Sequence, residues 1–383
     1  MDIAIVIVAY NRTDSVRRLL DSLLHANYSQ SAPLIISIDK SKTDSVERLA
    51  DEFTWPFGEK IVVKHEQNLG LRRHILSIGE YTQKFDGVIV LEDDLEVSPS
   101  FYNYACETVA RYENDERIAG ISLYKFPINL QISLPFIPEN NGYDVFLFQN
   151  AQSWGQVWMK KSWSEFIEWY VNNSEEFSDL PHLPYTICHW GKNSWLKYHI
   201  KYCIEKNKYF VYPYISLTYC SGAPGTHSSV GNNFTHCAIL EGNKRGFRLP
   251  DFESAVKYDG FYERVGIEGA LGLDDVCFDL YGRKGNRMHH RYWLTTERAS
   301  FKVVRSYGMK YVPMEKNVIR QVEGAGIFLY DTQQPDVKPK NNFMDIVNYY
   351  KFNSLFSFMT KKGLLGSSWQ LVRYFTHKAL RRI

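Results

Sequence analysis

The first 94 residues alternate between strand-like and helix-like segments, and this alternation limits the fold more than any other feature of the 383-residue chain. Ile3 to Ala9 is an unbroken apolar, β-branched run, typical of a strand buried on both faces. Further strands are predicted at 34–38, 61–64 and 88–91, with helices through 16–24, from about 43 to 53 and from 71 to 85. Strands that alternate with helices form a parallel sheet through right-handed crossovers, so the sequence predicts an α/β fold.

Polar residues directly follow three of these predicted strands. Asn11-Arg12 follows the first strand, Asp39 the second and Glu92-Asp93-Asp94 the fourth. Ligands of parallel α/β sheets bind beyond the carboxyl ends of the strands, so we expect these three loops to meet at one crevice.

The acidic triplet Glu92-Asp93-Asp94 is the strongest chemical signal. Three successive carboxylates after a buried strand repel one another and lose hydration, so they need a compensating cation. Mg²⁺ or Mn²⁺ suits such a site, because it takes one or two carboxylates and fills its other positions with water and phosphate oxygens. The structural alternative is that the acids favour the start of a helix near Pro99 through the helix dipole. The convergence of the loops favours the metal.

Composition and motifs exclude several classes of protein. Apolar residues make up 44% and aromatic residues 15% of the chain, which is typical of a globular protein. The six cysteines lie far apart without a C-x-x-C pair, which disfavours a zinc knuckle or a disulfide framework and favours a reducing compartment. Neither a G-x-G-x-x-G motif nor a P-loop occurs, so NAD and ATP sites lack support. Without a signal-peptide pattern or an apolar run of about 18 residues, a cytoplasmic location is expected.

Charge is distributed unevenly along the chain. Residues 346–383 contain seven Lys or Arg and no acidic residue, which leaves residues 1–345 at −5 within a net charge of +2. An acidic body is a poor match for nucleic acid, so no nucleic-acid partner is expected. The basic, aromatic tail predicts a peripheral contact with an anionic membrane at its inner face. The alternative is a terminal helix docked on the acidic body.

Two segments carry a resemblance to a known family. Ile5 to Leu24, IVIVAYNRTDSVRRLLDSLL, and Val88 to Tyr104, VIVLEDDLEVSPSFYNY, resemble the nucleotide-sugar segments of GT-A fold glycosyltransferases. They are similar above all to the N-acetylglucosaminyltransferase I family and to bacterial family-2-like enzymes of surface-polysaccharide synthesis. The resemblance implies a Rossmann-like, mostly parallel central sheet flanked by helices. It also implies a nucleotide-sugar-binding half (1–125), an acceptor-binding half of the same domain (126–240), a C-terminal extension (241–345) and the basic tail (346–383).

The resemblance further implies roles for individual residues. Asp94 would ligate the Mn²⁺ or Mg²⁺ that bridges the donor diphosphate, and His227 is a second candidate for the metal or pyrophosphate. The residues expected to bind the nucleotide sugar are Arg12, Asp39, Arg72, His74, Glu92 and Asp93. Trp154, Gly155 and Trp195 would line the sugar and acceptor pocket. Structural alternatives stay open: Asp39 as a turn acid, Arg12 paired with Asp14, and a structural His227.

One departure from the family concerns the catalytic base. In the relatives a carboxylate follows the tryptophan of a Ser-Trp pair at the head of a helix, whereas Leu196 follows Ser194-Trp195 in this chain. The nearest downstream acid is Glu205. A base relocated to the preceding segment would be one of Glu165, Glu168, Glu175, Glu176 and Asp179. A retaining enzyme and a degenerate, inactive one are the alternatives.

The sequence thus leads to one hypothesis with two alternatives. The resemblance implies a metal-dependent, inverting hexosyl- or N-acetylhexosaminyltransferase that uses a nucleotide-sugar donor, with UDP as the expected nucleotide. Its acceptor would be a hydroxyl of a glycan or lipid-linked oligosaccharide in surface-polysaccharide synthesis. A metal-dependent sugar nucleotidyltransferase shares the pattern of a strand followed by acids. A non-catalytic protein that binds nucleotide sugars is the alternative suggested by Leu196.

Overall fold

The computed structural model describes residues 1–220 and 236–337, together with residues 349 and 352. The chain divides into two compact units: residues 1–274 with 282–290, and residues 275–281 with the described residues from 291 onward. His227 and nearly all of the basic tail therefore lie outside the described residues. None of the described helices is long and apolar enough to span a membrane.

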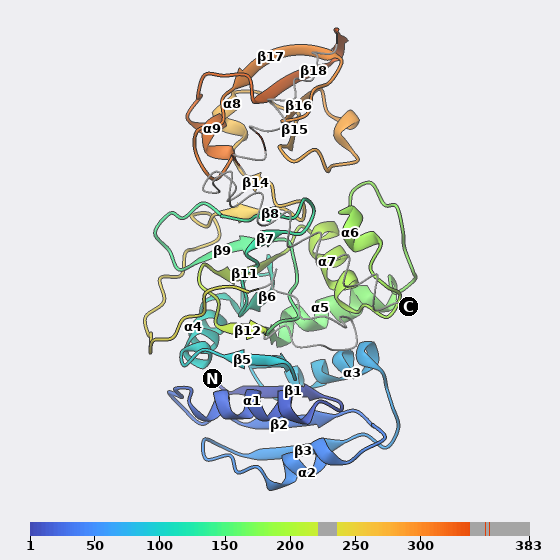
Figure 1. Ribbon diagram of the computed structural model, residues 1–383, viewed down its shortest axis with the longest axis vertical. Coiled ribbons are helices and arrows are strands. Elements are labelled where there is room, and N and C mark those ends of the chain that lie inside the picture. Colours follow the sequence, from blue (N-terminus) through green and yellow to red (C-terminus); the bar gives the residue numbers. More distant parts are fainter. Residues whose placement is uncertain (221–235, 338–348, 350–351, 353–383) are drawn as a thin grey trace, which may run out of the picture. The chain divides into compact units, whose positions relative to one another are not determined.

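The first unit is built on a mixed ten-stranded sheet in the order β14-β13-β9-β11-β6-β10-β4-β1-β2-β3 (Figure 1). Its strands are β1 (Ile3–Ala9), β2 (Leu34–Ile38), β3 (Lys60–Lys64), β4 (Gly87–Glu92), β6 (Ile118–Ser122), β9 (Val145–Phe148), β10 (Gln156–Met159), β11 (Tyr209–Pro213), β13 (Lys257–Tyr258) and β14 (Arg264–Val265). The four strands predicted from the sequence, β1 to β4, are all parallel. The predicted α/β class is confirmed.

Later strands make the sheet mixed. β10 lies antiparallel between β4 and β6, and β6 pairs in parallel with β11. β13 and β14, from the segment expected to be a C-terminal extension, complete the sheet beside β9. The first unit therefore continues beyond residue 240, where the acceptor half was expected to end. Two short pairs accompany the sheet: β5 (Leu95–Val97) with β12 (Thr218–Cys220), and β7 (Ile128–Asn129) with β8 (Leu134–Pro135).

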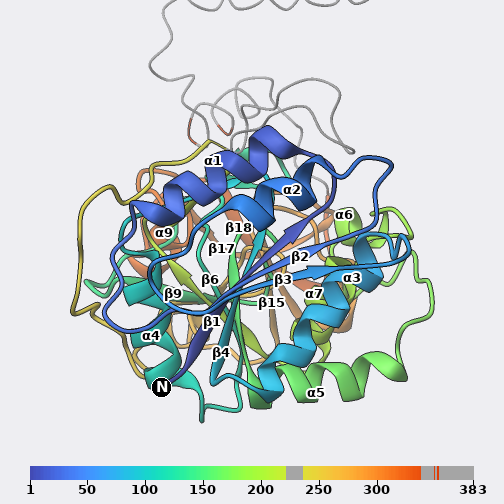
Figure 2. The ribbon, with the colours of Figure 1, turned by 90° about the horizontal axis from the view of Figure 1, so that it is seen from below.

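Helices cover both faces of the N-terminal strands. The helices of the first unit are α1 (Thr13–Leu24), α2 (Ser45–Glu52), α3 (Leu71–Ile78), α4 (Phe101–Tyr112), α5 (Lys160–Val171), α6 (Tyr185–Cys188), α7 (Leu196–Glu205) and α8 (Glu268–Leu271), with 3₁₀ turns η1 (Gly79–Gln83) and η2 (Arg287–His289). α1 and α2 lie on one side of β1 to β3, and α3 and α5 on the other (Figure 2).

The third predicted helix, 71–85, is divided at Gly79 into α3 and η1. A Cβ atom at Gly79 would lie 1.9 Å from the Trp163 indole, so only glycine lets α5 approach this closely. Glycine also lowers helix stability by about 1 kcal/mol relative to alanine. The division therefore depends on a partner 84 residues away, which helical periodicity does not reveal.

The core explains why β1 and α1 form where the sequence predicts them. Ile3, Ile5 and Ile7 point to one face of β1 and pack in one apolar cluster with the α1 side chains Val16, Leu19, Leu20 and Leu23. Each fully buried aliphatic side chain contributes roughly 1.5–3 kcal/mol to stability. This packing fixes the end of β1 and the start of α1, the turn that contains Arg12.

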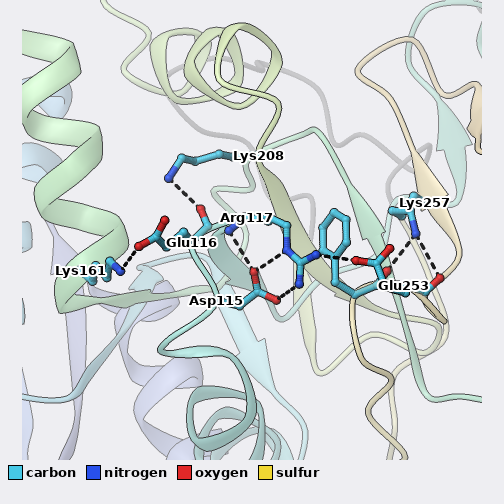
Figure 3. A network of polar contacts seen from close by, with 8 residues as sticks. Asp115, Glu116, Arg117, Lys161, Lys208, Glu253 and Lys257 are labelled. Atoms are coloured by element: carbon cyan, nitrogen blue, oxygen red, sulfur yellow. Dashed lines mark hydrogen bonds and ion pairs between the residues drawn. The ribbon is translucent and has the colours of Figure 1, made fainter.

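The parallel strands give the sheet two distinct edges. We call the edge where β1, β2, β4 and β6 end the carboxyl edge, and the opposite one the amino edge. A charged network lies at the amino edge, where Asp115, Glu116 and Arg117 precede β6 (Figure 3). Arg117 donates to Asp115 (Nε to Oδ1, 2.8 Å) and to Glu253 (Nη1 to Oε1, 2.6 Å). Lys208, which precedes β11, donates to the Glu116 carbonyl (2.8 Å).

The second unit is a four-stranded sheet in the order β15-β16-β18-β17. Its elements are β15 (Val276–Asp279), β16 (Tyr292–Thr295), β17 (Phe301–Tyr307), β18 (Ile327–Pro335) and the short helix α9 (Glu315–Ile319). Its small core contains Cys277, Trp293, Phe328 and Tyr330.

Candidate active site

Arg12 and the acidic triplet come together at the carboxyl edge. β1 and β4 are neighbours, with Val8 opposite Glu92, so the turns that follow these strands are adjacent. Arg12 Nη1 donates to Asp94 Oδ2 at 3.1 Å, and Nη2 donates to Asp93 Oδ1. These partners differ from Asp14, the partner named by the structural alternative for Arg12. Two of the three predicted loops therefore meet in direct contact.

The triplet carries more negative charge than Arg12 balances. Burial raises the pKa of Glu92 to about 8, and the charges of Asp94 and Asp93 raise it further. Burial also raises the pKa of Asp93 to about 6, although the Arg12 guanidinium opposes that shift. A second cation at this position would stabilise the ionised carboxylates and reverse both shifts.

The acids fit a divalent cation. Asp94 Oδ1 is buried and has no hydrogen-bond partner among the described residues, whereas Oδ2 accepts from Arg12. A carboxylate oxygen that accepts no hydrogen bond is free to coordinate a metal, and carboxylate oxygens are ligands that Mg²⁺ and Mn²⁺ prefer. No group of three or more His, Cys, Asp or Glu side chains within the described ranges is arranged to enclose a metal. The free Asp94 oxygen suits an ion that takes one or two protein carboxylates and completes its shell with other oxygens.

Asp39 ends β2 and holds the loop that precedes α3. Its side chain is 4% exposed. Oδ1 accepts from the backbone N–H groups of Lys40 (2.9 Å) and Leu69 (2.8 Å), and Oδ2 accepts from that of Gly70 (3.0 Å). This is the geometry of the turn-acid alternative. Its predicted contact with the nucleoside stays a prediction.

Arg72 and His74 on α3 both have partners within the protein. Arg72 contacts α5, α7 and the segment between them. His74 is buried, and its Nε2 shares a hydrogen bond with Ser37 Oγ (2.8 Å). Burial, aided by the neighbouring His65, lowers the pKa of His74 to about 4, so it is neutral at pH 7. Their predicted role in binding the nucleotide sugar has no support from these contacts.

Trp154 and Gly155 immediately precede β10 at the carboxyl edge, where Gln156 pairs with Ser122. The half-buried Trp154 ring packs against Tyr124, with ring centroids 4.9 Å apart. Gly155 has a φ of +90°, and a Cβ atom there would lie 2.6 Å from Thr218 Cγ2. Thr218 Oγ1 donates to the Trp154 carbonyl at 2.6 Å, which ties Trp154 to β12. Their expected place beside the sugar stays a prediction.

Trp195 is a core residue. Its side chain is 2% exposed, and its ring meets the Trp158 ring edge-on at 6.0 Å between centroids. A buried indole cannot line an open pocket, so the expected pocket role of Trp195 needs correction. The presence of a tryptophan in the sequence does not tell whether its ring contacts a sugar or packs in the core.

The pair β5–β12 was not anticipated from the sequence. Cys220 at the end of β12 lies opposite Leu95, the residue after Asp94. The chain therefore returns to the acidic triplet after more than 120 residues, and His227 lies a few residues further along, outside the described residues. Strands of three residues carry too little periodicity to be recognised.

The five candidate bases lie in different places. Glu165 pairs with Lys208, the residue before β11, at the amino edge, and Glu168 is exposed on α5. Glu175, Glu176 and Asp179 are exposed in the segment between α5 and α6. Glu176 Oε1 lies 3.9 Å from Lys197 Nζ, in the first turn of α7 beside Leu196. Glu176 is thus the candidate that the structure brings to the head of α7.

Comparison with known proteins supports the predicted resemblance over part of the chain. Residues 1–127 match the GNT-I family. An Arabidopsis thaliana protein described as an alpha-1,3-mannosyl-glycoprotein 2-beta-N-acetylglucosaminyltransferase is 31% identical over 134 residues. That alignment covers 31% of this chain and 30% of the relative, so the chain spans less than a third of the relative it matches. The matched third contains β1 to β4, Arg12, Asp39 and the acidic triplet.

Solved structures give only weak likenesses. Staphylococcus aureus TarS 1-349 in complex with UDP-GlcNAc is 11% identical with a TM-score of 0.38, over 59% of this chain and 60% of that one. The mannosyltransferase PcManGT of Pyrobaculum calidifontis, in complex with GDP-Man and Mn²⁺, is 12% identical with a TM-score of 0.30, over 44% and 46%. Scores below 0.5 add nothing to the fold described above.

Proposed function

We propose that this chain is a GT-A type glycosyltransferase that transfers a sugar from a nucleotide sugar, with UDP as the expected nucleotide, to a hydroxyl acceptor. The observation that carries the proposal is the cluster of Arg12, Asp93 and Asp94 at the carboxyl edge, with Asp94 Oδ1 buried and unpartnered. This cluster lies within the residues that match the GNT-I family.

The residues present suggest how the reaction would be supported. Asp94, with Asp93 beside it, would hold Mn²⁺ or Mg²⁺, which supplies positive charge to the departing diphosphate. Arg12 would add a second positive charge on the same side. The Arabidopsis relative is described as an N-acetylglucosaminyltransferase, so N-acetylglucosamine is the first sugar to test on the expected UDP donor.

An inverting transfer needs a base at the acceptor side. The acceptor oxygen forms a bond to the anomeric carbon, the bond to the diphosphate oxygen breaks with its electron pair, and the acceptor proton passes to a carboxylate. We assign this base to Glu176, because it is exposed and lies at the first turn of α7. The acceptor would be a glycan or a lipid-linked oligosaccharide of surface-polysaccharide synthesis. The basic tail would then hold the enzyme at the inner face of an anionic membrane.

Metal-dependent UDP binding tests this proposal directly. Calorimetry of the wild type should show at least tenfold tighter UDP binding with Mn²⁺ than without it. Asp94→Ala should lose this difference while keeping its melting temperature, because removing Asp94 relieves its repulsion with Glu92 and so offsets the lost contact with Arg12. Asp14→Ala, an exposed acid at the start of α1, is the matched control and should behave like the wild type. Unchanged metal dependence in Asp94→Ala would overturn the assignment.

Leu196 favours a second candidate function, a non-catalytic nucleotide-sugar-binding protein. Leu196 opens α7 and offers no proton acceptor. Such a protein would bind UDP with Mn²⁺ but release no UDP from any nucleotide sugar. The nucleotidyltransferase alternative would instead form a nucleotide sugar from a sugar 1-phosphate and UTP, which a pyrophosphate-release assay detects.

A further inference from the structure

Arg72 connects more parts of the first unit than its place on α3 suggests. Its Nε donates to the Tyr170 hydroxyl near the end of α5 (2.8 Å). Nη1 donates to the Lys192 carbonyl and Nη2 to the Ser174 carbonyl, each at 3.3 Å. The guanidinium carbon lies 4.3 Å from the centroid of the Tyr198 ring on α7. Each guanidinium nitrogen therefore contacts a different part of the chain.

The backbone of Arg72 is fixed to the candidate nucleotide site. Arg72 follows Gly70 by two residues, and the Gly70 N–H donates to Asp39 at the end of β2. The Leu69 N–H donates to the same carboxylate. The first turn of α3 is thus held against the carboxyl edge, and any movement of Asp39 and its loop would displace Arg72.

The segment held by Arg72 is the connection between α5 and α7, residues 172–195, which we call the 172–195 segment. Apart from the four-residue helix α6 it is irregular. Ser174 and Lys192, whose carbonyls accept from Arg72, lie near its two ends. The guanidinium therefore closes the segment into a loop.

Other contacts hold the same segment on α7. The Phe177 ring lies 5.0 Å from Lys197 Nζ and 5.1 Å from Lys201 Nζ, and meets the Tyr198 ring edge-on at 5.4 Å. Lys197 Nζ donates to the Trp190 carbonyl at 3.4 Å. These contacts fix the segment to α7, whereas Arg72 joins it to α3. α3, α5 and α7 lie on the same side of the molecule in both ribbon views (Figures 1 and 2).

We infer that Arg72 is a positioning residue. When a nucleotide orders Asp39 and the loop before α3 at the carboxyl edge, Arg72 would also order the 172–195 segment that carries Glu176. This inference rests on the proposed function. It replaces the predicted role of Arg72 as a nucleotide ligand, because the guanidinium donates to protein groups on three sides. Arginine suits the role since its planar fork supplies donors in several fixed directions, whereas lysine presents a single compact charge.

Hydrogen exchange of the full chain tests the inference with UDP and Mn²⁺ as the probe. Arg72→Gln should raise amide exchange in the 172–195 segment at least tenfold without ligand. In the wild type, UDP with Mn²⁺ should slow exchange both around Leu69 and in the segment. In Arg72→Gln the slowing around Leu69 should persist, and the slowing in the segment should disappear. A purely local structural contact would raise the basal exchange and leave the UDP-dependent change intact.

Arg73→Gln is the matched control, because Arg73 is exposed on the same helix. Arg72→Lys should restore part of the protection, which keeps the test valid if the glutamine variant unfolds. The calorimetric affinity for UDP with Mn²⁺ should stay within twofold of the wild type in both Arg72 variants. Equal exchange of the segment in wild type and Arg72→Gln, or a tenfold loss of UDP affinity, would overturn the inference. If the wild type binds no UDP, the proposed function fails, while exchange without ligand still decides whether Arg72 holds the segment.

Discussion

Replacing Asp39 by asparagine measures how much the end of β2 depends on a negative charge. Asparagine has nearly the same shape but offers one acceptor oxygen. If that oxygen still accepts the hydrogen bonds from the Lys40 and Leu69 N–H groups, the side-chain NH₂ faces the Gly70 N–H. Both of these groups are donors, so the hydrogen bond to Gly70 is lost. Exchanging two charge-assisted bonds for neutral ones costs about 1 kcal/mol each, and a buried unpaired amide costs about 1–3 kcal/mol. We therefore expect a loss of about 3–5 kcal/mol in the free energy of unfolding.

Urea denaturation at pH 7, with hydrogen exchange of residues 66–72 as a local measure, checks this value. Asp14→Asn, at an exposed acid in the first turn of α1, should cost at most about 1 kcal/mol, because it loses only the interaction of the charge with the helix dipole. A loss below about 1 kcal/mol in Asp39→Asn would refute the reasoning, because the three amide bonds would then contribute little. UDP affinity measured without metal separates the roles further. A weakening seen only with Mn²⁺ present would contradict a contact between Asp39 and the nucleoside.

Two further variants test other sites. His199 is fully buried and has no hydrogen-bond partner among the described residues, and burial lowers its pKa to about 3 from an unfolded value near 6.5. Because the unfolded chain binds the proton more tightly, the free energy of unfolding falls as the pH drops below about 6.5. His199→Phe removes this loss, so in urea titrations it should increase the free energy of unfolding by about 2 kcal/mol more at pH 5 than at pH 7. An equal increase at both pH values would contradict this. Glu176→Gln should lower kcat for sugar transfer about 10²- to 10⁴-fold with unchanged donor affinity, whereas Glu175→Gln serves as the control. Full activity in Glu176→Gln would exclude it as the base.

Local sequence patterns predict well the parts of the fold that depend on neighbours along the chain. β1 and β2 match their predicted bounds, because strands buried on both faces consist of continuous apolar runs. The meeting of the Arg12 loop and the acidic triplet was predicted from the rule that strand ends share one edge of the sheet, whereas the hydrogen bonds from Arg12 to Asp93 and Asp94 were not. β10 was not predicted, since its four residues pair with strands remote in sequence. Whether an aromatic ring is buried or exposed also depends on partners that are distant in sequence. Trp195, for example, packs against Trp158.

The position of β10 has a consequence for how the chain acquires its structure. β10 covers the side of β4 that faces β6, so the apolar run Val88–Val90 has no partner there until residues 156–159 have been made. A fragment ending at residue 127 would keep every residue of the family match yet present β4 as an open apolar edge, which invites aggregation. Residues 1–127, which carry the family match, are therefore unsuited to expression as a separate fragment. During synthesis the position between β4 and β6 is filled only after β10 has left the ribosome.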